Sequence, residues 1–428
     1  MEVKEKAKIG YKKTELGLIP EDWNLKTIGE LTDKIGDGIH STPVYNGTGK
    51  FYFINGNNLE NGKVSLDEDT KRLDDFESKK HIRPLNSQTI LLSINGTIGN
   101  VAFYQNENVV LGKSAAYINI KKNVVREFFY YTIQTERTQL FFRNNLTGST
   151  IKNLGLGTIR STPLSLPPTL AEQKAIATAL SDVDALIEKL EALITKKQAI
   201  KEGVMQRLLT PPNKGGQRLP GFDGEWEEKT IESYCLSFTK QTGFDYSNHI
   251  KPKLVKNNSD LVIPFIQNKD FDGTWINYNT DYYIPKEVAY QFPRILLNEK
   301  CLLISISGSI GKVGVFNNDK TAFIGGAVAV GKFKDKSLLE WVMYYLKSRT
   351  GQNMMFKDVK AGSHQNLILD DIRKMIVPVP ALEIRNKVVD ILNSMEKEIL
   401  LLRIKKTKYQ KIKEGMMQEL LTGKTRLV

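Results

Sequence analysis

Residues 171–210 read AEQKAIATALSDVDALIEKLEALITKKQAIKEGVMQRLLT, and the spacing of their apolar side chains decides the fold. These side chains recur in alternating steps of four and three residues, a period that keeps them in one narrow stripe along a helix. The stripe consists of Ile176, Leu180, Val183, Ile187, Leu190 and Ile194. Thr169 and Glu172 have the spacing of a capping box, and Pro211 follows the last turn. We therefore predict one long helix that needs a partner helix to cover its stripe.

A second helix of the same kind lies at the end of the chain. The sequence KEGVMQRLLT of residues 201–210 returns 212 residues later as KEGMMQELLT, residues 413–422. The same displacement brings apolar residues onto stripe positions of the first helix, and these are Val388, Leu392, Met395, Ile399 and Leu402. We expect the two helices to pair as an antiparallel coiled coil, with an internal pseudo-two-fold symmetry between the two halves of the chain.

The repeat extends beyond the helices. SINGTIGNV at residues 93–101 matches SISGSIGKV at residues 305–313, again 212 residues apart. LIPEDW at residues 18–23 has a counterpart in LPGFDGEW at residues 219–226. The chain is therefore one unit written twice, with a scaffold that is shared and surfaces that differ.

Each half is expected to hold a globular domain followed by a long helix. Short apolar runs broken by Gly, Asn and Asp predict strands, and one helix follows them over residues 127–142 in the first half and 338–355 in the second. The extra residues of the second half fall in the polar segment 240–260, which we predict to be a longer loop. The fold class is thus α+β, with two mixed α/β domains. The expected boundaries are 1–165 for the first domain, 166–212 for the first helix, 213–377 for the second domain and 378–428 for the second helix.

Composition narrows the class of partner. The formal net charge of +13 and the pI near 9.3 favour a polyanion, with nucleic acid ahead of a membrane surface, although a lysine-rich coding bias is an alternative. Cys235 and Cys301 are the two cysteines, and the sequence has no CxxC and no paired histidines. We therefore expect neither a disulfide framework nor a metal site. No apolar run approaches the roughly 20 residues of a membrane span, so we expect a cytoplasmic protein.

The order of these features resembles the specificity subunit of type I restriction-modification systems, over essentially the whole chain. Typical motifs are LGLIPEDW at 16–23, IGDGIHSTP at 35–43, LPGFDGEW at 219–226 and the two KEG-containing helix ends. The resemblance implies two target-recognition domains, each reading half of a split site in double-stranded DNA. It implies that the helices dock methylation subunits, in two copies, and that restriction subunits are further partners. It also implies that this chain catalyses nothing and holds no cofactor, because S-adenosylmethionine is expected in the methylation subunit.

Two other functions stay open. A stand-alone DNA methyltransferase would need an Asn- or Asp-Pro-Pro-aromatic motif, whereas the Pro-Pro pairs here stand in LPPT at 166–169 and TPPN at 210–213. Nucleotide binding is not supported. Gly308–Lys312 has part of a phosphate-loop pattern, but Ile306 and Val313 stand where that motif needs Gly and Ser or Thr. The other alternative is a coiled-coil scaffold without a DNA role. A salt-dependent shift of duplex DNA in the presence of the partner would exclude it.

Candidate base-reading residues lie on polar loops of both domains, because Asn, Gln, Lys, Ser and Thr can contact base edges in the major groove. The same residue types also form turns for purely local reasons. Gly96, Gly99, Gly308 and Gly311 recur in both halves, so we expect them to form scaffold turns rather than to read bases. The candidates in the first domain are Asp37, His40, Ser41, Thr42, Asn55, Asn57, Asn58, Asn95, Thr97, Lys113 and Ser149. Those in the second domain are Lys240, Gln241, Thr242, Gln267, Asn268, Lys269, Ser307, Ser309, Ser363, His364 and Gln365.

The first long helix carries a second apolar face beside its stripe. Leu186, Leu193 and Ile200 repeat every seven residues and lie outside the stripe positions. We predict that this face binds the methylation subunit. The alternative is that the helix packs on its own globular domain.

Overall fold

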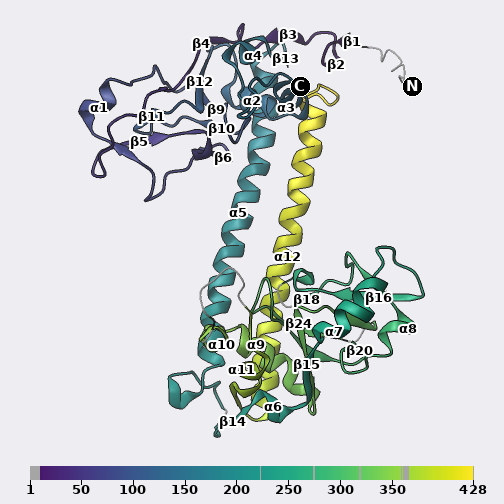
Figure 1. The fold of residues 1–428 in the computed structure, drawn as a ribbon. Helices are drawn as coiled ribbons and strands as arrows, with labels where there is room; N and C mark the ends of the chain where they lie inside the picture. The colour runs from purple at the N-terminus through teal and green to yellow at the C-terminus, as the bar shows by residue number, and fades with distance from the viewer. Residues whose placement is uncertain are drawn as a thin grey trace. The chain divides into compact units, whose positions relative to one another are not determined.

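The computed structural model describes residues 10–221, 223–272, 275–317, 320–357, 359 and 366–427. The chain divides into two compact units. Unit 1 comprises Met1–Leu190 with Lys405–Val428, and unit 2 comprises Glu191–Ile404. Each unit holds one globular part and one half of each long helix, α5 and α12 (Figure 1). These helices run over Leu170–Leu208 and Leu382–Leu420.

The globular part of unit 1 is built on a four-stranded antiparallel sheet with the order β10-β9-β12-β4. Strand β9 is buried on both faces, because Ile90 and Leu92 pack with helix α2 while Leu91 packs with a smaller sheet, β11-β5-β8. The elements before α5 are β1 (Tyr11–Thr14), β2 (Gly17–Pro20), β3 (Asn24–Thr27), β4 (Thr32–Asp37), β5 (Phe51–Ile54), η1 (Gly56–Asn58), β6 (Leu59–Glu60), β7 (Lys63–Val64), β8 (Arg72–Leu73), α1 (Asp75–Lys79), β9 (Thr89–Ser93), β10 (Val101–Phe103), β11 (Val109–Leu111), β12 (Ala115–Ile120), α2 (Arg126–Ile133), α3 (Glu136–Asn144), α4 (Leu156–Ser161) and β13 (Pro163–Leu166).

Unit 2 repeats this architecture. Its main sheet has the order β15-β24-β21-β22, and Leu302 and Ile304 of β21 pack with helix α9 while Leu303 packs with the smaller sheet, β19-β16-β23-β20. The elements are η2 (Pro212–Lys214), β14 (Glu227–Thr230), α6 (Ile231–Tyr234), β15 (Cys235–Lys240), α7 (Gly243–Asp245), η3 (Tyr246–Ile250), η4 (Lys251–Lys253), β16 (Val262–Ile266), η5 (Asn268–Asp270), β17 (Phe271–Asp272), β18 (Trp275–Ile276), β19 (Tyr283–Pro285), α8 (Lys286–Ala289), β20 (Leu296–Leu297), β21 (Cys301–Ser305), β22 (Val313–Phe316), β23 (Ala322–Ile324), β24 (Val328–Phe333), η6 (Lys336–Leu338), α9 (Leu339–Lys347), α10 (Arg349–Phe356), α11 (Leu369–Lys374) and β25 (Ile376–Val379).

Within unit 2 the two long helices pair in antiparallel fashion. Lys197 forms an ion pair with Glu398 at 2.7 Å, and Lys201 with Glu396 at 2.6 Å. Residue numbers therefore rise along α5 as they fall along α12.

The same direction holds within unit 1. Asp184 of α5 pairs with Lys413 of α12 at 2.7 Å, while Ile176 shares a core cluster with Leu420. Most of the predicted apolar stripe is buried, and it is half-buried at Val183, Ile187, Met395 and Leu402. The fully buried stripe positions are Ile176, Leu180, Leu190, Ile194, Val388, Leu392 and Ile399. The prediction of an antiparallel helix pair is thus confirmed in each unit.

Two predicted elements were wrong in detail. The single helix expected after the strands is two helices in each unit, because Thr135 and Ser348 interrupt it by capping the second helix. The Thr135 hydroxyl accepts a hydrogen bond from the Thr138 amide at 3.4 Å, and the Ser348 hydroxyl accepts one from the Gly351 amide at 3.2 Å. The segment 240–260, predicted to be a loop, contains the helical turns α7, η3 and η4.

The predicted glycine turns are confirmed. Gly96, Gly99, Gly308 and Gly311 all have φ between +70° and +92°, the left-handed region that side chains disfavour. In the described part of the chain, no helix is long and apolar enough to cross a membrane.

A half-buried lysine of unit 2 should make the stability of this unit depend on pH. Lys347 Nζ lies 3.5 Å from the Glu396 carboxylate, and burial lowers the pKa of Lys347 from 10.5 to about 8. Between these values the unfolded chain binds a proton that the folded chain has released, so stability should rise with pH over that window. Because Glu396 keeps its ion pair with Lys201 at 2.6 Å, Lys347→Met should remove this dependence and stabilise unit 2 at pH 7 by up to about 3 kcal/mol.

Urea unfolding of wild type and Lys347→Met at pH 7.5 and pH 9.5 measures this difference. Lys357→Met, at an exposed position of the same unit, is the matched control. Parallel pH profiles for wild type and Lys347→Met would contradict the assignment.

Candidate nucleic-acid interface

The predicted reading loops of unit 1 are joined to one another by hydrogen bonds. The Ile39 amide donates to the Leu111 carbonyl at 2.8 Å, and the Thr97 hydroxyl donates to the Gly56 carbonyl at 2.8 Å. Two more bonds complete the group: Ser114 Oγ to Asn55 Oδ1 at 2.9 Å, and the Leu154 amide to the Ile94 carbonyl at 2.9 Å. Five loops that are far apart in sequence thus form one surface, which we call loop cluster 1. It comprises residues 37–43, 54–58, 94–97, 112–114 and 147–154.

The first loop of this cluster, residues 37–43, and the residue after it form hydrogen bonds with two side chains that the sequence analysis missed, Arg83 and Glu77. Arg83 donates to the backbone carbonyls of residues 37 and 38, at 2.9 and 3.1 Å. The Glu77 carboxylate accepts a hydrogen bond from the Val44 amide at 3.2 Å. Its hydrogen bonds with Lys80, the Val44 amide and His81 lower the pKa of Glu77 to about 2. The carboxylate therefore stays ionised at neutral pH and keeps its hydrogen bond to the Val44 amide.

The predicted readers of loop cluster 1 differ in exposure and in the hydrogen bonds that they make within the protein, and Thr97 is both hydrogen-bonded and exposed. Asn55, Asn58 and Thr97 make hydrogen bonds within the cluster that shape it: Asn58, for example, accepts from the Asn55 amide at 2.9 Å and donates to the Ser65 carbonyl at 3.1 Å. Asp37 is half-buried and accepts a hydrogen bond from His40 Nε2 at 2.9 Å, and Asn95 is also half-buried. The exposed candidates are His40, Ser41, Thr42, Asn57, Thr97, Lys113 and Ser149.

Unit 2 has an equivalent surface. The Gly325 amide donates to the Ile266 carbonyl at 2.7 Å, and the Leu367 amide donates to the Ile306 carbonyl at 2.9 Å. We call this surface loop cluster 2, and it comprises residues 240–242, 266–270, 305–309, 324–328 and 366–370. It surrounds a cavity of about 500 Å³. The cavity is lined by Lys240, Ile306, Ser307, Gly326, Asn366, Leu367, Ile368, Leu369 and Asp370.

Some predicted readers of unit 2 are held by the protein itself. Gln241 is 4% exposed, and its amide donates to the Ile324 carbonyl, so it anchors its loop and lies too deep to reach a base. Asn268 donates to the Ser307 carbonyl at 2.8 Å, and Lys269 pairs with Asp281. Gln267 and Ser307 are half-buried, whereas Lys240, Thr242 and Ser309 are exposed. Ser363, His364 and Gln365 lie outside the described residues.

The predicted partner face is partly exposed. Leu193 and Ile200, both in unit 2, are 38% and 45% exposed. Leu186, in unit 1, is half-buried. Two of the three side chains are thus open to a partner, and binding itself stays a prediction.

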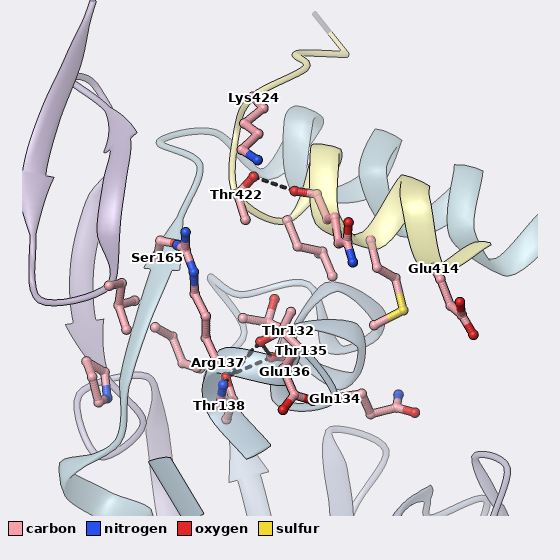
Figure 2. Close-up of a pocket in the computed structure, with 16 residues that line it drawn as sticks. Thr132, Gln134, Thr135, Glu136, Arg137, Thr138, Ser165, Glu414, Thr422 and Lys424 are labelled. Atoms are coloured by element: carbon pink, nitrogen blue, oxygen red, sulfur yellow. Dashed lines mark hydrogen bonds between the residues drawn. The ribbon is translucent and has the colours of Figure 1, made fainter. Parts of the chain in front are cut away.

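A second cavity, also of about 500 Å³, lies in unit 1 away from the reading loops (Figure 2). Its walls are the turn between α2 and α3, strand β13 and the last turns of α12. Figure 2 shows Gln134, Arg137 and Glu414 around it, and none of its lining residues belongs to loop cluster 1. Across the described ranges, no group of three or more His, Cys, Asp or Glu side chains is placed to hold a metal ion.

The comparison with protein families identifies the two halves of the internal sequence repeat. The model of the type I restriction modification DNA specificity domain matches residues 20–202 and again residues 225–414. The chain belongs to this family. Each match contains one loop cluster and one of the long helices almost entirely, so the family unit corresponds to one half of the internal repeat.

Individual relatives of the specificity family match from about 70% to nearly all of the chain. A putative type I restriction enzyme MjaX specificity subunit from Methanocaldococcus jannaschii is 24% identical over 440 residues, covering 97% of both chains. The EcoBI specificity subunit from Escherichia coli is 24% identical over 315 residues, covering 71% of this chain and 65% of its own. The crystal structure of the type I S subunit from M. genitalium has the same fold, with a TM-score of 0.56 at 17% identity, covering 93% of this chain and 96% of that one.

Proposed function

We propose that this chain is the DNA-recognition subunit of a type I restriction-modification complex and that it catalyses no reaction itself. Loop cluster 1 would read one half of a split DNA site and loop cluster 2 the other. The observation that carries this proposal is the pairing of one repeated scaffold with two loop clusters of different chemistry. Two copies of one scaffold that expose different side chains are suited to reading two different half-sites.

The chemistry of the exposed residues supports the proposal. Loop cluster 1 presents His40, Asn57 and Lys113, while loop cluster 2 presents Lys240 and Ser309. These side chains can donate to base edges or phosphates, and the net charge of +13 favours approach to DNA. A methylation subunit would supply the reactive chemistry and bind S-adenosylmethionine, and it would dock on the exposed face of α5.

Exchange of the globular parts tests this function. The antiparallel pairs β3–β13 and β14–β25 close each globule at its base, so residues 28–161 and residues 231–374 can be replaced between paired strands. Replacing 28–161 with the corresponding part of a relative should change one half of the methylated site and leave the other half unchanged. Replacing 231–374 is the matched control and should change only the other half.

Methylome sequencing of cells that also express the methylation subunit reads out both exchanges. A change in both halves from either exchange would contradict two independent readers. Methyl transfer by the isolated chain would contradict the non-catalytic role, and unaltered sites after both exchanges would favour a scaffold without a DNA role.

A further inference from the structure

Unit 2 carries a helical insertion that has no counterpart at the matching place in unit 1. The connection from β15 to β16 contains α7, η3 and η4, which together span Gly243–Lys253. The connection from β4 to β5 in unit 1, residues 38–50, is described throughout and contains no helix. The insertion begins directly after residues 240–242 of loop cluster 2.

The insertion is a fixed element of the fold. Ile250 is fully buried in the core cluster that contains Phe265 and Ile266, and Tyr246 packs against the same cluster. Thr242 caps the first turn, because its hydroxyl accepts from the Asp245 amide at 3.1 Å and donates to the Asp245 carboxylate at 2.6 Å. Because the segment is already ordered, little conformational entropy would be lost when a partner contacts it.

The outer side of this element presents groups suited to DNA. Phe244 is 70% exposed, and its ring meets the His249 ring edge-on with centroids 5.7 Å apart. Asn248 donates to the Phe244 carbonyl at 3.1 Å, which leaves its side-chain carbonyl oxygen and second N–H for other partners. Lys251 and Lys253 follow on the next turn and are exposed. Asn and His can bond base edges, an aromatic ring can contact a thymine methyl group, and lysines bind phosphate.

The insertion is also in the right place. Gln241, the residue before its cap, is anchored to the Ile324 carbonyl inside loop cluster 2. At Gly326, a lining residue of the cavity in that cluster, a Cβ would stand only 4.0 Å from the Tyr246 ring. The inserted helix and the reading loops therefore form one continuous surface.

We propose that Gly243–Lys253 is an additional DNA-reading element of unit 2, in which Asn248, His249 and Phe244 contact bases while Lys251 and Lys253 contact phosphates. This inference rests on the proposed function. It implies that the half-site of unit 2 is read over more base pairs, or more tightly, than loop cluster 2 alone would allow. Unit 1 has no such element at this connection, so the two half-sites should respond differently when the insertion is altered.

Variants in the assembled complex with the methylation subunit test the inference. Combining Asn248→Ala with His249→Ala should relax one or two positions of the unit 2 half-site and weaken binding of a cognate duplex about tenfold, without changing the unit 1 half-site. Combining Lys251→Ala with Lys253→Ala should weaken binding to every sequence and reduce the salt dependence by about two counterions. Methylome sequencing and fluorescence anisotropy with a labelled duplex measure these effects.

Phe244→Ala has a matched control in Tyr290→Ala, because Tyr290 is an aromatic residue that is 55% exposed on unit 2 and lies outside both the insertion and loop cluster 2. Phe244→Ala should weaken cognate binding, and Tyr290→Ala should not. If the wild-type complex reads a split site and all three insertion variants bind and methylate it unchanged, the inference is wrong while the proposed function stands. Loss of assembly with the methylation subunit at unchanged DNA affinity would also overturn it, since the surface would then bind protein. If the wild-type complex shows no sequence-specific binding, it is the proposed function that fails.

Discussion

Replacing Arg426 by alanine is expected to destabilise unit 1 by about 2–4 kcal/mol, because it leaves a buried carboxylate without its partner. Arg426 Nη2 donates to Glu172 Oε2 at 2.9 Å, and the Glu172 side chain is only 1% exposed. The same guanidinium donates to both oxygens of Asp22 at 2.9 Å and lies over the Trp23 ring, with 5.9 Å to its centroid. One side chain near the end of the chain therefore joins the first turn of α5 to the segment before β3.

Thermal and urea unfolding of the full chain measure the effect. Lys424→Ala removes an exposed cation from the same tail and should leave stability within about 0.5 kcal/mol of wild type. Arg426→Lys keeps the charge but loses the two-pronged geometry, so it should fall between wild type and Arg426→Ala. Adding Glu172→Gln to Arg426→Ala should recover part of the loss, because the neutral amide is easier to bury. Equal stability of Arg426→Ala and Lys424→Ala would refute the role of Arg426.

The contact of Arg426 with Glu172 also shows where local sequence patterns stop being informative. Thr169 and Glu172 have capping-box spacing, and half of the box is present, because the Thr169 hydroxyl accepts from the Glu172 amide at 3.2 Å. The Glu172 carboxylate is instead bound by a residue 254 positions later. A motif read over four residues carries no information about such a distant partner.

Features that repeat along the sequence were predicted well. The apolar stripe correctly predicted which face of α5 and of α12 is turned away from solvent, because the same heptad pattern repeats along a coiled-coil seam. The break at Ser348 was missed although residues 347–353, KSRTGQN, contain no large apolar side chain, and although Ser348 caps the next helix through the Gly351 amide three residues later.

The structure brings the predicted loops together within each unit, whereas their contact with bases stays a prediction. Asn58 and Gln241 carry side-chain amides of the kind that can bond to bases. In the structure, these amides form hydrogen bonds with the surrounding loops instead. Sequence cannot separate these two uses, because the same amide chemistry serves both. Phe244 was not among the sequence candidates, because its 70% exposure becomes visible only in the structure.

Changing Leu193 and Ile200 together to aspartate is expected to abolish assembly with the methylation subunit while unit 2 stays folded. The two side chains are 38% and 45% exposed and lie seven residues apart on α5, so they share one face. Burying two aspartates against an apolar partner surface would cost several kcal/mol, enough to reduce a nanomolar association more than a hundredfold. Co-purification and a titration with the separately purified methylation subunit measure the loss.

The same helix supplies a matched control. Ala192 and Ala199 are also exposed and also seven residues apart, each one position earlier in the sequence and so rotated by about 100° around the helix. Changing both to aspartate adds the same charge and a similar cost in helix propensity, so assembly should survive while thermal stability changes equally in the two variants. Normal assembly of the Leu193 and Ile200 variant would show that the partner docks elsewhere. Loss of assembly in both variants would mean that α5 is contacted on a wider face than this pair of apolar residues defines.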